Sequence, residues 1–355
     1  GISIATLAIS AISALAFGTV SASITKIDAF AGIDKRPDKK SSAINYLLVG
    51  SDTREGLTKA ELKELRVGSV ATAAGKRSDT MLLVHISKAR DKAVLVSIPR
   101  DTFALIPAHL NKAGKTIPAV HSKINSAFNW GGAPLLIQTI EEMTQLKIDH
   151  YVEVNFAGFA SVIDSLGGIE VCTKKDIDDP KSHLVLPAGV HTLNGIEALK
   201  YVRTREFDGM GDIGRMQRQQ AFMSSVLKKA TSAGVLLNPI TMTSFINSSL
   251  AAVTTDEGLK NSDLITLAKQ MKSLATSNVR TLTVPLSDLN YYSNGVTASV
   301  LWDPVLAPEL WDRLREDRAV VDEVTASPSP SSTKAAKVEI VDKFKTRTAD
   351  DNICR

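Results

Sequence analysis

The sequence predicts an α/β fold, with a mixed central β-sheet flanked by helices in an α/β/α arrangement. Continuous apolar runs, typical of strands buried on both faces, occur at 44–52, 79–87 and 92–98. Amphipathic segments at 133–146 and 156–166 carry apolar residues at helical spacing. Because strands and helices interleave along the chain, one layered domain around a central sheet accounts for both patterns.

The composition indicates a large folded domain. The chain has 355 residues, of which 44% are hydrophobic and 23% charged, enough to bury a sizeable core and to exclude disorder throughout. The formal net charge is +4, from 42 basic and 38 acidic residues. This excess is far below that of a dedicated nucleic-acid binder, so we expect no nucleic-acid partner.

The N-terminal region is apolar and is followed by a polar segment. No charged side chain occurs before Lys26, and the run is long enough to span a bilayer. We predict a transmembrane anchor at 1–25, truncated at its N-terminus because no initiator Met is present, and a stalk at 26–42. A cleaved signal peptide is the alternative, because small residues at 21–23 offer a cleavage point. Both interpretations place the rest of the chain outside the cytoplasm, and the first makes it a single-pass membrane protein.

The two cysteines, Cys172 and Cys354, fit an oxidising compartment, where the only two cysteines of a chain tend to form a disulfide. A bridge would tie the C-terminal tail to the middle of the domain. Two unpaired thiols are the alternative. The sequence from 326 is rich in Ser, Pro and Ala, so we expect the domain to cover 43–324, with a low-complexity segment and a tail tethered by Cys354 over 325–355.

The first predicted strands end at polar residues. The run at 44–52 stops at Gly-Ser-Asp. The runs at 79–87 and 92–98 are separated by a turn-like segment and resemble a hairpin. The second of them stops at Pro99, which cannot donate to a central ladder. Polar side chains are therefore expected at strand ends.

The helices and strands that follow alternate. Pro134 marks the start of the helix at 133–146, and two glycines end the helix at 156–166. The remaining expected elements are strands at 151–154, 168–171 and 279–284 and helices at 193–201 and 215–230.

Arginine and aspartate cluster just beyond the predicted strands. The clusters lie at 52–54, 77–79, 99–101 and 201–220, and no phosphate-binding loop, zinc-protease, nucleophile-elbow or Cys-x-x-Cys motif accompanies them. Guanidinium groups bind phosphate oxygens bidentately, and adjacent carboxylates suit Mg²⁺ bound with substrate phosphates. The pattern favours a pyrophosphate ligand and phosphoryl transfer. Surface arginines that serve only solubility are the alternative.

Several longer motifs, in order, resemble the LytR-CpsA-Psr family over 44–230. They are NYLLVGSDTR, RSDTMLLVHI, VLVSIPRDT, HSKINSAF, GGIEVC, LPAGVHTLNGIEALKYVRTR and DIGRMQRQQ. The resemblance implies an α/β/α domain with a hydrophobic channel for a polyprenyl tail. It implies a phosphotransferase that moves a glycopolymer, arabinogalactan or teichoic-acid-like, from a polyprenyl-pyrophosphate carrier to a peptidoglycan sugar hydroxyl. The sequence around the two cysteines resembles actinobacterial members, which favours arabinogalactan.

The resemblance also assigns roles to residues. Asp52 and Asp79 are expected to hold Mg²⁺ or Mn²⁺. The expected catalytic residues are Asp52, Arg77, Asp79, Arg100, Asp101 and Arg203. The expected pyrophosphate ligands are Arg54, Arg77, Arg100, Lys123, Arg203, Arg205, Arg215, Arg218 and Gln219. Asp101 and Asp212 either orient arginines or act as the base for the incoming hydroxyl.

The apolar stripes of the first two helices are either core or a lipid site between the helices. The residues expected to contact lipid are Leu136, Ile140, Met143, Phe156, Phe159, Val162 and Ile163. Two other functions stay open, a polyprenyl-pyrophosphate hydrolase that uses water and a non-catalytic binder of polyprenyl phosphate. A product that depends on the acceptor separates the transferase from the hydrolase.

Overall fold

The computed structural model describes residues 24–53, 57–65, 78–111, 113–204, 211–230, 232, 238–260, 263, 276–325 and 338–348. Its centre is an eight-stranded sheet of order β1-β14-β9-β2-β3-β4-β15-β20. These strands are β1 Thr25–Ile27, β14 Val253–Asp256, β9 His150–Val154, β2 Ile44–Ser51, β3 Ser78–Ile86, β4 Ala93–Ile98, β15 Val279–Thr283 and β20 Arg347–Thr348. The sheet contains both parallel pairs, such as β2 with β9, and antiparallel pairs, such as β2 with β3, which confirms the predicted mixed sheet.

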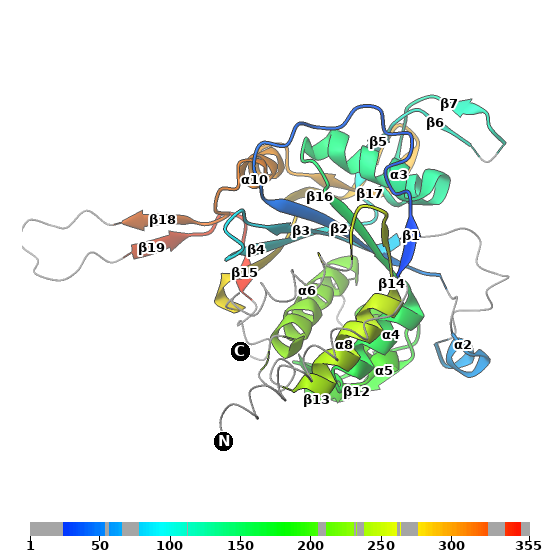
Figure 1. Ribbon diagram of the computed structural model, residues 1–355, viewed down its shortest axis with the longest axis vertical. Helices are drawn as coiled ribbons and strands as arrows, with labels where there is room; N and C mark the ends of the chain where they lie inside the picture. The colour runs from blue at the N-terminus through cyan, green and yellow to red at the C-terminus, as the bar shows by residue number, and fades with distance from the viewer. Residues whose placement is uncertain are drawn as a thin grey trace, which may run out of the picture.

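Helices cover both faces of this sheet (Figure 1). One layer holds α3 (Asn125–Thr144) and α10 (Leu306–Arg315), drawn above the sheet. The opposite layer holds α4 (Phe156–Ser165), α5 (Gly195–Arg203), α6 (Gly211–Ala230) and α8 (Pro239–Ala252), drawn below it. The predicted α/β/α arrangement is confirmed.

Smaller elements surround these layers. They are α2 Lys59–Leu65, the 3-10 helix η2 Thr276–Asn278, and the strand pairs β5 Phe103–Ile106 with β8 Val120–Lys123, β6 His109–Leu110 with β7 Thr116–Ile117, β10 Ile169–Thr173 with β13 Gly189–Leu193, β11 Ile177–Asp179 with β12 Leu184–Leu186, β16 Leu286–Ser293 with β17 Val296–Trp302, and β18 Asp322–Thr325 with β19 Val338–Val341.

The central strands are buried on both faces, which explains why their sequences are continuously apolar. On β3, Met81 and Leu83 pack into the core beneath α3 and α10. The alternate residues Leu82 and Val84 pack on the other face, where Met223 of α6 meets them. Successive side chains of a strand point to opposite faces, so one strand supplies both cores.

The structure confirms most predicted elements within a few residues. The hairpin of β3 and β4 is antiparallel, with Met81 opposite Ile98 and Ile86 opposite Ala93. Helix α3 begins eight residues before the predicted start at 133. It contains a break at Gly132, whose φ is 65°. The predicted start at Pro134 is therefore the start of the second segment of this helix, because proline suits a first helical turn.

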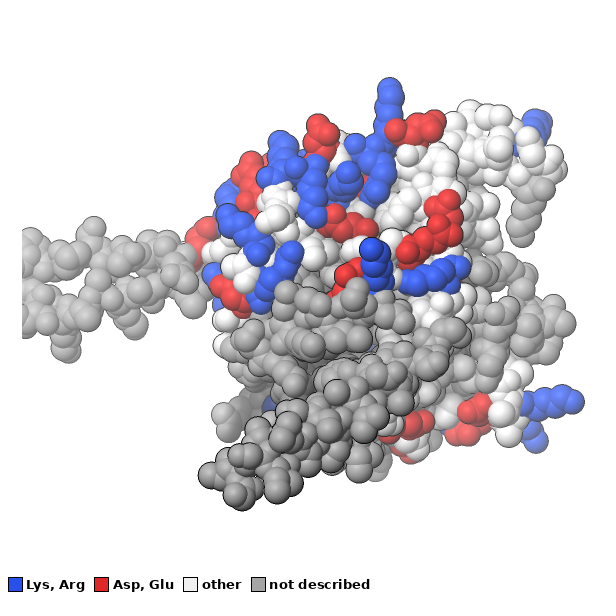
Figure 2. All heavy atoms as spheres, in the orientation of Figure 1, with Lys and Arg blue, Asp and Glu red and all other residues white. Residues whose placement is uncertain are grey.

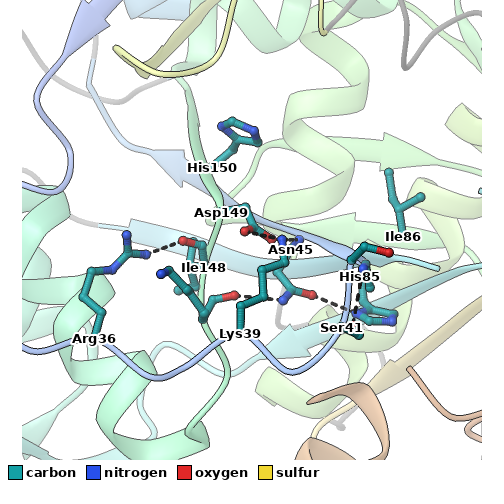
Figure 3. Close-up of polar contacts among 12 residues, drawn as sticks. Arg36, Lys39, Ser41, Asn45, His85, Ile86, Ile148, Asp149 and His150 are labelled. Carbon is teal, nitrogen blue, oxygen red and sulfur yellow. Dashed lines mark hydrogen bonds and ion pairs between the residues drawn. The ribbon is translucent and has the colours of Figure 1, made fainter. Parts of the chain in front are cut away.

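The predicted stalk at 26–42 is wrong. Strand β1 lies in this region and pairs with β14 in the central sheet. Ala29 is fully buried. Arg36 forms an ion pair of 2.6 Å with Glu141 of α3 and also donates to the carbonyl of Ile148 (Figure 3). This segment belongs to the folded domain, and its polar composition concealed that role.

The boundary predicted at 324 is also wrong. Phe344 lies in the core, and β20 forms the edge of the sheet beside β15. The domain therefore extends at least to residue 348. The predicted anchor at 1–25 lies almost wholly outside the described residues. Within the described ranges, no helix combines the length and hydropathy needed to cross a bilayer.

Candidate functional site

The ends of three adjacent strands meet at one edge of the sheet. Val49 near the end of β2 pairs with Met81 near the start of β3. Met81 in turn pairs with Ile98, the last residue of β4. Antiparallel pairing thus brings Asp52, Asp79 and the Arg100-Asp101 pair to the same edge, although they lie far apart in the sequence.

A β-bulge sets the position of Asp79. Gly50 pairs with Thr80 while Ser51 pairs with Ser78, so Asp79 is an extra residue in the ladder. Bulges of this kind redirect a side chain and are common beside active sites. The backbones of Asp52 and Asp79 thus lie at neighbouring strand ends, an arrangement that fits a cation held by two carboxylates and by substrate phosphates. Among the described residues, this site included, no group of three or more His, Cys, Asp or Glu side chains is placed to hold a metal.

A narrow cavity lies beside these strand ends. Its lining residues come from β3, β4, the segment after β4, α6 and β17: Thr80, Met81, Ser97, Ile98, Pro99, Arg100, Asp101, Arg215, Gln219 and Val300. Its volume is about 30 Å³, room for roughly one or two water molecules.

Asp101 connects the cations of this edge. Its carboxylate lies 3.4 Å from Lys123 Nζ and 3.6 Å from Arg100 Nε, and its side chain is 16% exposed. The backbone here is held in place, because Val300 N donates to Asp101 O at 2.8 Å and Asn125 N donates to Arg100 O at 3.2 Å. This arrangement orients Arg100 and Lys123 through one carboxylate.

Helix α6 adds two buried guanidinium groups. Arg215 is 6% exposed and Arg218 8% exposed. Arg215 and Gln219 stand one turn apart and both line the cavity. Charges buried in this way act in a low-dielectric surrounding, where an anionic ligand is attracted more strongly than in water.

Other contacts brace α6 against its neighbours. Arg218 donates to Thr204 O at 2.6 Å, and Gln219 donates to Val202 O at 3.1 Å. Gln220 donates to Thr283 Oγ1 at the end of β15. Burial raises the pKa of Tyr201, so this phenol stays protonated at neutral pH and cannot act as a base. Arg218 thus holds α6 against the end of α5, while Arg215 lines the cavity, and a role for Arg218 in binding pyrophosphate stays a prediction.

Arg203 is not among the residues that line this cavity. Its guanidinium stands over the ring of Phe156, 5.4 Å from the centroid, and donates to Leu65 O at 3.4 Å. It ends α5, a helix that begins with a capping box formed by Asn194 and Glu197. A direct role for Arg203 in binding or catalysis stays a prediction.

The positions of several predicted site residues are not described by the structure. Arg54, Arg77, Arg205 and Cys354 lie outside the described residues, as do the side chains of Asp79 and Asp212. Cys172 is buried and is not a free thiol. Its pairing with Cys354 stays a prediction.

The predicted lipid site between the first two amphipathic helices is wrong. Leu136 and Ile140 of α3 are fully buried above the sheet, where Met143 packs beside them. Phe156, Phe159, Val162 and Ile163 belong to α4, on the opposite face (Figure 1). The sheet separates the two stripes, which mainly form core. The partly buried Leu48, Val84 and Met223 instead present apolar surface between the sheet and α6.

Sequence reasoning missed part of the cavity lining. Val300 reaches it from β17 through a bridge with Thr102, and Trp302 Nε1 donates to Thr102 Oγ1 at 3.2 Å. No motif marks these residues, since about two hundred residues separate them from the segment that they contact. Thr80 and Ser97 lay within predicted strands, and only the strand pairing shows that they face the cavity.

Comparisons with known proteins agree with this geometry. The model of the LytR_cpsA_psr family matches residues 16–308. The chain is 36% identical over 276 residues to the "Probable cell wall biosynthesis protein LcpB" of Corynebacterium glutamicum, covering 78% of this chain and 62% of that protein. It is 35% identical over 204 residues to TagT of Bacillus subtilis, named a polyisoprenyl-teichoic acid–peptidoglycan teichoic acid transferase, covering 56% of each. The chain thus spans between about half and two thirds of the length of these curated relatives.

Solved structures with the same fold include two that contain ligands. "TagT bound to LIIa-WTA" has a TM-score of 0.59 and 26% identity, and the match covers 81% of this chain and 98% of that one. YwtF (TagT) "with bound octaprenyl pyrophosphate lipid" has a TM-score of 0.55 and 26% identity, with coverage of 83% and 98%. These two neighbours thus carry LIIa-WTA and octaprenyl pyrophosphate on the fold described above.

Proposed function

The chain belongs to the LytR-CpsA-Psr family, and from that premise we propose that it is a phosphotransferase acting in cell-wall assembly. It moves a glycopolymer from a polyprenyl-pyrophosphate carrier to a sugar hydroxyl of peptidoglycan. The observation that carries this proposal is the cavity at the shared end of β2, β3 and β4, where Arg100, Asp101 and Arg215 converge. The names of the relatives support the donor and the acceptor classes.

The reaction is a substitution at phosphorus. The acceptor hydroxyl oxygen forms a bond to the phosphorus that carries the glycan. The bond from that phosphorus to the bridging oxygen breaks, polyprenyl phosphate leaves, and the hydroxyl proton passes to a base. Arg100, Lys123 and Arg215 bind the phosphate oxygens and stabilise the negative charge that builds on the leaving phosphate.

Within this site we assign Asp101 to orientation. Its distances to Arg100 and Lys123 let one carboxylate hold both cations toward the donor. Gln219 adds an amide to the same cavity. Rigid donors of this kind lower the barrier because they need little reorganisation during the reaction.

Asp52 and Asp79 are the residues that would hold Mg²⁺ or Mn²⁺. The bulge that sets Asp79 beside the end of β2 supports this assignment. The ion, when bound, neutralises charge on the phosphate oxygens.

The lipid tail would follow the apolar surface below the sheet. Leu48, Val84 and Met223 offer partly buried apolar contacts there, and the octaprenyl pyrophosphate in the TagT structure supports a lipid site in this fold. The sequence around Cys172 and Cys354, which resembles actinobacterial members of the family, supports arabinogalactan as the polymer.

We propose membrane attachment through the segment at 1–25, with the domain outside the cytoplasm. In that oxidising compartment, a disulfide between Cys172 and Cys354 would hold the C-terminal tail against the domain.

A single transfer assay tests this function. The protein is incubated with a synthetic polyprenyl-pyrophosphate glycan and Mg²⁺, with and without soluble peptidoglycan fragments. We expect a glycan–peptidoglycan adduct that EDTA abolishes and that Arg100→Ala lowers by about 10²–10³ in kcat. Arg318→Ala is the matched control, because Arg318 is an exposed arginine paired with Glu316 on the surface.

Other outcomes identify the alternatives. Release of glycan phosphate at the same rate with and without acceptor indicates a hydrolase. Lipid binding without any turnover indicates a binder.

A further inference from the structure

A second groove lies between the β6–β7 hairpin and the start of α3, away from the strand-end cavity. Its lining residues are His109, Asn111, Ala113, Ile117, Asn129 and Trp130. Its volume is about 520 Å³, within the usual range for ligand pockets. The hairpin projects at the upper right of Figure 1, and Figure 2 shows a mostly uncharged surface there.

The aromatic wall of this groove is preorganised. The rings of His109 and Trp130 stack with centroids 5.5 Å apart and an interplanar angle of 11°. His109 Nδ1 lies 2.8 Å from Pro107 O, so this nitrogen carries the proton and the bond fixes the ring. Trp130 is 37% exposed, whereas Trp302 and Trp311 pack against each other in the core.

Besides His109, the described polar residues of the groove are two amides, Asn111 and Asn129. Asn111 Oδ1 accepts from Ala113 N and Lys115 N, both at 3.0 Å, which leaves its NH₂ group as a donor. Asn129 adds a second amide. The described lining residues include no Lys, Arg, Asp or Glu. Aromatic faces attract the C–H face of a sugar ring, and amides bond its hydroxyl and acetamido groups, so this lining suits a neutral sugar better than a phosphate.

The groove is close to the strand-end cavity. Asn125 N donates to Arg100 O, and Trp130 follows five residues later on α3. At a rise of 1.5 Å per residue, Trp130 lies about 8 Å along the helix from Asn125, the residue that binds the Arg100 backbone. The break at Gly132 gives this first helical segment an axis distinct from the rest of α3.

The cavity and the groove take lining residues from helices on opposite faces of the sheet. Arg215 and the apolar surface beside Met223 belong to α6, below the sheet, while Trp130 belongs to α3, above it (Figure 1). In a phosphoryl transfer the attacking and leaving oxygens lie roughly in line on opposite sides of phosphorus. A lipid phosphate that leaves on the α6 side therefore requires an acceptor that enters from the α3 side.

We propose that the groove lined by His109, Asn129 and Trp130 is the acceptor subsite, in which a sugar ring of the peptidoglycan glycan strand stacks on Trp130. This inference rests on the proposed function and names where its acceptor binds. The glycan of the donor is the other source of a sugar ring, and the experiment separates the two.

The first measurement is direct binding of a soluble peptidoglycan glycan fragment, by calorimetry and by tryptophan fluorescence. The fragment is expected to perturb the emission of Trp130. Trp130→Ala should weaken binding about tenfold, and Trp130→Phe should restore most of it because the aromatic face remains. Val185→Ala, at a side chain 74% exposed on β12, should leave binding unchanged.

The second measurement is steady-state transfer. Trp130→Ala should raise the acceptor KM about tenfold while the donor KM and kcat stay as in the wild type. A rise in the donor KM instead assigns the groove to the donor glycan and overturns the proposal. The proposal is also overturned if Trp130→Ala leaves glycan binding and the acceptor KM unchanged. It is overturned as well if this variant loses binding to liposomes while its binding of the glycan fragment stays intact. If the wild-type chain forms no adduct, the proposed function fails, while the binding measurement still shows whether the groove binds the glycan fragment.

Discussion

At the scale of single residues, the most informative group is the carboxylate of Asp101. It contacts Lys123 and Arg100 at 3.4 and 3.6 Å and is only 16% exposed. A half-enclosed carboxylate with two cationic neighbours is better suited to hold them than to take a proton from a hydroxyl. The sequence motif identified all three residues, but only the structure shows that one side chain organises the other two.

This geometry predicts the effect of Asp101→Asn. The amide keeps the shape and loses the charge, so Arg100 and Lys123 are less well oriented, and kcat should fall about tenfold to a hundredfold. The pH–rate profile of the transfer reaction should keep its shape. Asp178→Asn, at an exposed carboxylate of β11, is the matched control.

The base hypothesis makes a different prediction for the same variant. If Asp101 accepts the hydroxyl proton, the acidic limb of the profile disappears in Asp101→Asn. That result would contradict the orienting role.

At the scale of elements, the sequence predicted a strand or helix correctly where the apolar pattern of the segment itself reveals its burial. Strand β2 was predicted at 44–52 and runs over Ile44–Ser51, because both faces are apolar and its end is polar. Strand β1 carried no such signal, since it has three residues and depends on its pairing with β14. The lipid site failed for a similar reason, because an apolar stripe does not reveal which face of the sheet its helix covers.

The segment that joins β1 to β2 contains an ion pair that tests whether this segment stabilises the folded domain. Glu141 is buried at 1% exposure, and its carboxylate binds Arg36 and accepts from Ile148 N. Arg36→Ala leaves this charge without its cation and should lower the free energy of unfolding by about 3 kcal/mol in urea titrations.

A neighbouring ion pair provides the control. Lys39 pairs with Asp149 at a more exposed position (Figure 3), and Lys39→Ala should cost less than about 1 kcal/mol. Equal costs for the two variants would mean that the Arg36 contact adds nothing beyond a surface pair.

At the scale of the whole molecule, a buried hydrogen-bond chain joins the sheet to the α10 layer. His85 of β3 lies between Asn45 Oδ1 of β2, at 2.7 Å, and Asp317 Oδ1 after α10, at 3.1 Å. Figure 3 shows His85 and Asn45 turned toward each other. Burial lowers the pKa of His85, although the hydrogen bond that His85 donates to Asp317 opposes that shift. The imidazolium therefore forms less readily in the folded chain than in the unfolded one.

The burial of His85 predicts how the stability of the protein depends on pH. The ordinary pKa of 6.5 applies to His85 in the unfolded chain and a lower value in the folded one. The unfolded state thus binds more protons below pH 6.5, and the free energy of unfolding should fall as the pH drops through that value. His85→Gln should flatten this slope in urea titrations between about pH 7.5 and 5.5. His191→Gln, near the surface, should leave the slope unchanged, and a slope retained in His85→Gln would assign it to other groups.

The bulge at Asp79 has a consequence for how such a site can change over time. Because Asp79 is an extra residue in the ladder, the side chains before it in β3 need not follow the alternation between sheet faces that the rest of the strand keeps. Side chains beyond the bulge can be re-aimed at a new substrate, while Met81, Leu83 and their partners keep the alternation that the core requires. The chemistry at this edge can therefore diversify without a matching cost in foldability.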